Sequence, residues 1–77
     1  MMKEQIITFI REIISDKGHN LNQEINESTN LRDDLGLSSF DLATLTVMIE
    51  DKYGVDVFED GIILTFGEII ERIKNKI

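Results

Sequence analysis

Apolar residues recur at helical spacing in three stretches of the chain. In residues 2–17, isoleucine and phenylalanine follow the i, i+3, i+4, i+7 pattern, and charged residues fill positions between them. Residues 39–53 repeat the pattern with leucine and isoleucine, and residues 66–77 repeat it with phenylalanine and isoleucine. These stretches predict three amphipathic helices, each with one apolar face for a shared core.

The residues at the ends of these stretches are types that start and stop helices. Ser38 precedes the second stretch and Asp41 follows three residues later, which predicts a capping box in which each side chain bonds the other residue's backbone. Thr65 and Glu68 repeat this spacing before the last stretch. Gly54 is suited to end the second helix, because glycine readily takes the left-handed conformation found there. These signals set the predicted bounds of the second and last helices.

The segments between the helices are less regular. Residues 19–37 are rich in asparagine, serine and threonine and carry isolated apolar residues, which predicts an ordered loop lying across the core. Residues 55–64 give mixed signals. Because the chain offers no other strand for them to pair with, we expect a short helix at about 59–63. Residues 1–77 are therefore predicted to form one all-α domain, a small four-helix bundle with a short third helix and a long first loop.

The acidic residues are concentrated in the middle of the chain. The formal net charge is −7, and the stretch from Asp33 to Asp60 holds eight acids against one lysine, which equals the whole net charge. Nucleic-acid binding is not expected, because phosphate neutralisation needs clustered lysine and arginine. An acidic surface attracts a basic protein partner, although it also simply aids solubility.

The composition excludes several kinds of chemistry. The chain has no cysteine, so it can form no disulfide, thiolate metal site or thiol nucleophile of its own. Its single histidine, His19, falls in the asparagine-rich loop with no partner for a catalytic dyad. No signal-peptide core and no apolar run of membrane-spanning length are present, which predicts a cytoplasmic protein without membrane insertion.

One hydroxyl remains as a candidate site. If Ser38 caps the second helix, Ser39 falls at the first helical position, where the backbone does not need its side chain. It is then an exposed serine beside acidic residues with no catalytic base in reach. We therefore expect Ser39 to be modified by another protein.

The sequence DLGLSSFDLATLTVMIEDKYGVDV resembles the acyl carrier protein family, whose members carry a D-L-G-x-D-S-L-D/E motif at the start of their second helix. The resemblance covers nearly the full chain. It implies that a separate phosphopantetheinyl transferase esterifies Ser39 with 4′-phosphopantetheine from coenzyme A. The attached phosphopantetheine would form an arm whose terminal thiol holds acyl groups as thioesters. The resemblance thus implies a carrier and not an enzyme, and it also implies a monomer.

The resemblance also implies partners and a recognition surface. The partners would be acyl-activating and acyl-transferring enzymes with basic docking patches, in fatty-acid or specialised biosynthesis of the polyketide, cell-envelope or peptide type. The second helix would be the recognition helix, and Phe40 could equally belong to the core. The expected contact residues are Phe40, Asp41, Val47, Glu50, Asp51 and Asp56.

Three departures from the family pattern favour a specialised pathway over the general fatty-acid synthase. Ser38 replaces the usual aspartate, Phe40 replaces a common leucine, and Thr44 stands where many members have glutamate. Together they make the first half of the recognition helix less acidic and more apolar.

Two other functions fit parts of the sequence. Asp56, Asp60 and Gly61 match three positions of a calcium-binding EF-hand loop, but Phe58 and Gly67 fall where oxygen ligands are required. We therefore expect no metal site. A helical interaction module that is never modified stays open, because the sequence alone does not distinguish it from a carrier.

Overall fold

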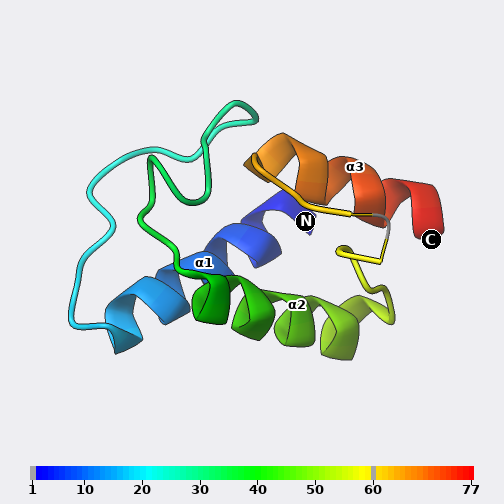
Figure 1. Cartoon of the computed structure of the whole chain (residues 1–77), viewed down its shortest axis with the longest axis horizontal. Helices are drawn as coiled ribbons and strands as arrows, with labels where there is room; N and C mark the ends of the chain where they lie inside the picture. The colour runs from blue at the N-terminus through cyan, green and yellow to red at the C-terminus, as the bar shows by residue number, and fades with distance from the viewer. Residues whose placement is uncertain (1, 60) are drawn as a thin grey trace.

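The structure, a computed structural model, describes residues 2–59 and 61–77. In this part of the chain three helices are formed, α1 (Met2–Asp16), α2 (Ser39–Tyr53) and α3 (Phe66–Lys76). α1 and α2 are in contact. The long connection between them runs around one end of the molecule (Figure 1). The all-α prediction is confirmed, and the helices begin and end within a residue of the expected positions.

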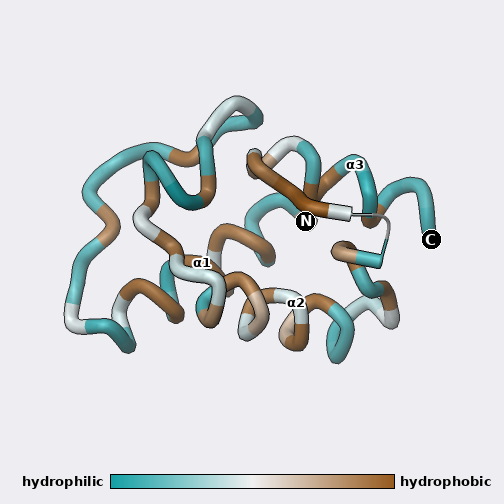
Figure 2. Tube along the Cα trace, in the orientation of Figure 1, coloured by the Kyte–Doolittle hydropathy of each residue, from teal (hydrophilic) through white to brown (hydrophobic). Residues whose placement is uncertain are grey.

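The apolar faces of all three helices meet in one core. Hydrophobic and hydrophilic residues alternate along α1 and α3, as the period predicted, whereas α2 is largely hydrophobic or neutral before its acidic last turns (Figure 2). Ile10 of α1, Leu45 of α2 and Ile69 of α3 each have no exposed surface. Burial of such side chains contributes roughly 1.5–3 kcal/mol apiece to folding. The apolar stripes identified in the sequence are therefore the source of the fold's stability.

The long loop is ordered, as its spaced apolar residues predicted. Leu31 is fully buried, and its backbone N–H donates to the Leu64 carbonyl at 2.9 Å. The Thr29 carbonyl accepts from the Phe66 N–H at 3.0 Å. These two bonds form an isolated antiparallel bridge between Asn30 of the loop and Thr65 before α3. No pairing partner for this later segment was expected from the sequence, and the loop is that partner.

The short third helix expected at 59–63 is not formed by the described residues, and this prediction is wrong. Turn hydrogen bonds run instead from the N–H groups of Glu59 and Gly61 to the carbonyls three residues earlier, at 3.3 and 3.1 Å. Gly61 has φ +118, a value far from any helix. Asp60, within the expected helix, lies outside the described residues.

The chain after this turn is extended. Ile62 and Leu64 are 79% and 52% exposed, whereas Ile63 between them is buried, an alternation typical of extended backbone. The Arg72 side chain of α3 donates to the carbonyls of Val57 at 3.0 Å, Gly61 at 2.6 Å and Ile62 at 3.3 Å. One guanidinium thus satisfies three backbone carbonyls of the segment before α3.

Candidate functional site

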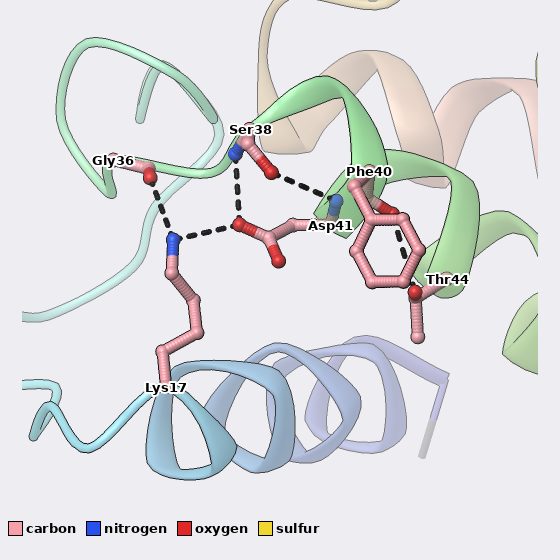
Figure 3. Close-up of polar contacts among 6 residues, drawn as sticks. All are labelled: Lys17, Gly36, Ser38, Phe40, Asp41 and Thr44. Atoms are coloured by element: carbon pink, nitrogen blue, oxygen red, sulfur yellow. Dashed lines mark hydrogen bonds and ion pairs between the residues drawn. The ribbon is translucent and has the colours of Figure 1, made fainter.

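The start of α2 is built by the predicted capping box. The Ser38 hydroxyl accepts from the Asp41 N–H at 3.1 Å, and the Asp41 carboxylate accepts from the Ser38 N–H at 2.8 Å. Both bonds are drawn in Figure 3. At the other end of α2, Gly54 takes the left-handed conformation and donates to the Glu50 carbonyl at 2.8 Å. The local signals in the sequence therefore placed both ends of α2 correctly.

Lys17, the residue directly after α1, completes this network. The Lys17 ammonium donates to the Asp41 carboxylate at 2.7 Å and to the Gly36 carbonyl at 3.1 Å (Figure 3). Desolvation by burial alone would raise the pKa of Asp41. The hydrogen bonds from Lys17 and Ser38 outweigh it and lower that pKa below its ordinary value. The carboxylate stays ionised at neutral pH and ties the end of α1 to the start of α2.

Asp41 was expected among the partner-contact residues, and its position does not suit that role. It is 7% exposed, and its carboxylate is engaged by Lys17 and Ser38. A partner would have to break these bonds before reaching the charge. We therefore assign Asp41 to the fold and leave it out of the recognition surface.

Ser39 is the hydroxyl that the cap leaves unused. It is the first residue of α2 and its side chain is exposed. The Arg32 guanidinium donates to its Oγ at 3.2 Å. An arginine is always charged and accepts no proton, so it cannot serve as the base that would make this serine a nucleophile.

A groove of about 630 Å³ runs beside Ser39. One wall is α2, with Leu42, Ala43, Thr46 and Val47, and the other is formed by Asp56, Phe58, Ile62 and Ile63. Among the described residues, Arg32 and Asp56 are the charged ones that line it, and the rest of this lining is mainly apolar. The hydroxyl at the start of α2 therefore opens onto this largely apolar groove. The second wall of the groove belongs to the segment whose carbonyls Arg72 binds.

The remaining expected contact residues are accessible. Phe40 is 80% exposed and Val47 is 67% exposed, so Phe40 belongs to the surface and not to the core. Glu50 and Asp51 are exposed on the last turns of α2, and Asp56 is exposed just beyond it. The expected surface is therefore apolar along α2 at Phe40 and Val47, and acidic at the end of α2 and just beyond it.

Arg32 and Lys17 are the site residues that sequence reasoning missed. Arg32 lies seven residues before Ser39, and Lys17 lies just after the end of α1, so no local period connects either one to the site. The only available signal was that Arg32 is a lone cation directly before the paired acids Asp33 and Asp34.

No cluster of three or more histidine or acidic side chains arranged to hold a metal ion is found among residues 2–59 and 61–77. Asp60, which the calcium-binding alternative requires, lies outside those ranges. Nor is any helix in the described part of the chain both long and apolar enough to cross a bilayer.

The chain is similar to known proteins over most of its length. The sequence profile of the family described as "Phosphopantetheine attachment site" matches residues 8–73. The acyl carrier protein of Thermotoga maritima is 34% identical, with 97% of this chain and 95% of that protein covered. The acyl carrier protein of Lactobacillus acidophilus is 31% identical over 97% and 96% of the two chains. That of Exiguobacterium sibiricum is 29% identical over the full length of both. No solved structure matches the chain.

The start of α2 fits a phosphopantetheine group. The N-terminus of this helix of 15 residues favours a negative phosphate through its dipole. Ser39 offers an exposed oxygen, Arg32 offers a charge of the right sign, and the groove offers apolar walls for a carbon chain.

Proposed function

The chain belongs to the acyl carrier protein family, and from this premise we propose that Ser39 is the residue that receives 4′-phosphopantetheine. The family's members carry acyl groups and are not themselves enzymes. The observation that supports the choice of Ser39 is the division of work between two neighbouring serines. Ser38 is engaged in the capping box, whereas the Ser39 hydroxyl is exposed and free of the cap.

The residues around Ser39 bind and orient but do not catalyse. When attached, the phosphopantetheine group supplies a terminal thiol that holds an acyl group as a thioester. The proton of the Ser39 hydroxyl must leave to a base on the transferase, because the neighbouring Arg32 side chain only donates. The chain's part is to present this oxygen on a rigid helix start that the capping box and Lys17 hold in place.

The experiment that tests the attachment site uses both serines. Incubation with coenzyme A and a broad-specificity phosphopantetheinyl transferase should raise the intact mass by one phosphopantetheine. Ser39→Ala should abolish the gain. Ser38→Ala is the matched control and should keep it, at a cost of about 1 kcal/mol in stability from the lost cap. A gain that disappears with Ser38 and survives without Ser39 would disprove the assignment.

Partner recognition is assigned to the exposed surface of α2 and to Asp56, three residues after its end. The surface consists of Phe40, Val47, Glu50, Asp51 and Asp56, and its partners are the transferase and acyl-handling enzymes with basic patches. The acids increase the rate of encounter and the apolar pair contributes contact area.

Charge reversal tests this surface. The double variant Glu50→Lys, Asp51→Lys should slow loading by the transferase, and the difference from the unaltered chain should shrink as salt is added, because salt screens exposed charges. The matched control reverses Glu12 and Glu71, exposed acids on α1 and α3. Equal slowing by both double variants at low salt would show that only net charge matters.

A specialised pathway, and not the general fatty-acid synthase, is the proposed setting. Ser38 and Thr44 leave the first turns of α2 without two acids common in the family pattern. The variant Ser38→Asp, Thr44→Glu should therefore be accepted faster than the unaltered chain by the acyl transferase of a general fatty-acid synthase, measured by acyl loading. No increase in rate would count against a specialised setting.

A further inference from the structure

Arg32 is an arginine with unused hydrogen-bonding capacity beside the proposed attachment site. Its guanidinium donates to the Ser39 Oγ at 3.2 Å. Among the described residues it makes no ion pair with a carboxylate. A guanidinium has five N–H donors, so most of its capacity is available to an incoming anion.

The backbone that carries Arg32 is held rigidly. The Asn30 side chain accepts from the N–H groups of Arg32 at 3.0 Å and Asp33 at 2.8 Å. The Asp34 carboxylate accepts from the Asn30 N–H at 2.7 Å, and Leu31 is fully buried. These bonds fix the turn, so the entropy cost of placing Arg32 near Ser39 is partly met before any anion binds.

We propose that Arg32 is a positioning residue for the arm: its guanidinium binds the phosphate attached to Ser39 and directs the arm into the groove beside α2. The inference rests on the proposed function, since it takes Ser39 as the attachment point. A phosphate on Oγ has its oxygens within reach of a side chain that already contacts that atom. Arginine and phosphate form strong charge-assisted hydrogen bonds.

The charges around the groove support this direction. Asp56 also lines the groove, and its carboxylate repels a phosphate, which favours the phosphate's place at Arg32. Next to Ser39, the neutral Ser38 stands where the family pattern has an aspartate, so no carboxylate at that position competes for the guanidinium. Beyond the phosphate, Thr46, Val47 and Ile62 line the path with largely apolar surface.

The experiment uses the full chain loaded with phosphopantetheine. The chain has no cysteine, so a thiol-reactive nitroxide attaches only to the thiol of the arm. Amide signals broadened by the nitroxide then report where the arm lies. The variants are Arg32→Gln and the matched control Arg11→Gln, which removes the same charge from an exposed position on α1.

In the unaltered chain, the amides of Thr46, Phe58 and Ile63 should be broadened by the labelled arm. Arg32→Gln should reduce this paramagnetic relaxation by about two- to five-fold, the population change that an exposed ion pair supports. Added salt should weaken the broadening in the unaltered chain. Arg11→Gln should leave the profile unchanged, and the phosphorus NMR signal of the arm should shift only with Arg32→Gln.

The possible failures are distinguishable by mass. A chain that gains no phosphopantetheine refutes the attachment at Ser39 and the placement of the arm with it. A loaded chain whose broadening profile is the same with Arg32→Gln as without it refutes the role of Arg32 alone. Equal loss of broadening in the Arg11→Gln control would show a general charge effect and would also overturn the inference.

Discussion

Gly67, in the first turn of α3, lies against the backbone of the long loop. Its N–H donates to the Glu27 carbonyl at 2.9 Å, and a Cβ at this position would lie 2.8 Å from the same oxygen. Gly67→Ala therefore forces the loop away from α3. We expect a loss of about 1–2 kcal/mol in the free energy of unfolding, because overpacking outweighs the gain in helix propensity. Chemical denaturation measures the difference.

The matched control for this substitution is Glu71→Ala, at an exposed position of the same helix. It should change stability by less than about 0.5 kcal/mol, as surface substitutions usually do. Hydrogen exchange adds a local readout, since Gly67→Ala should weaken protection of the Gly67 and Thr29 amides. If Gly67→Ala raised the free energy of unfolding, the loop would move away from α3 without any loss of stability, and the prediction would be wrong.

Single residues were predictable where their partners are close in sequence. Ser38 and Asp41 are three residues apart, so a capping box is visible in the sequence and is found in the structure. Ser39 followed as a candidate from that one observation. Arg32 and Lys17 reach the same site across 7 and 24 residues, and their geometry depends on how the whole chain folds. No rule about local spacing could have assigned them.

At the scale of elements, the three long helices were predictable because each carries its own period and its own end signals. The conformation of the segment 55–64 was not predictable. Its conformation is decided by remote partners, namely the Arg72 guanidinium of α3 and the loop residues around Asn30. The sequence contains no strand-like partner for this segment, and a single bridge from an irregular loop pairs with its end instead. The same segment forms the second wall of the groove beside Ser39, so the groove could not be predicted either.

At the scale of the whole molecule, two effects of acid oppose each other. The net charge of −7 makes the folded chain repel itself, and protonating exposed carboxylates relieves that repulsion as the pH falls from 7. Asp41 acts in the other direction, because its folded pKa is lowered by Lys17 and Ser38. Its contribution is fully present above about pH 4 and is lost as the pH falls through the lowered folded value. Stability should therefore pass through a maximum in mild acid and then decline.

Asp41→Asn isolates the second effect. Asparagine can still accept from the Ser38 N–H but loses the charge that pairs with Lys17. The variant should lose about 1 kcal/mol at neutral pH, a modest figure because Lys17 is partly exposed. Its decline below about pH 4 should also be shallower. Asp16→Asn is the control for net charge, since Asp16 is an exposed acid at the end of α1. If urea denaturation across pH 2–7 gave the two variants the same profile, the Lys17–Asp41 pair would not be what couples α1 to the start of α2.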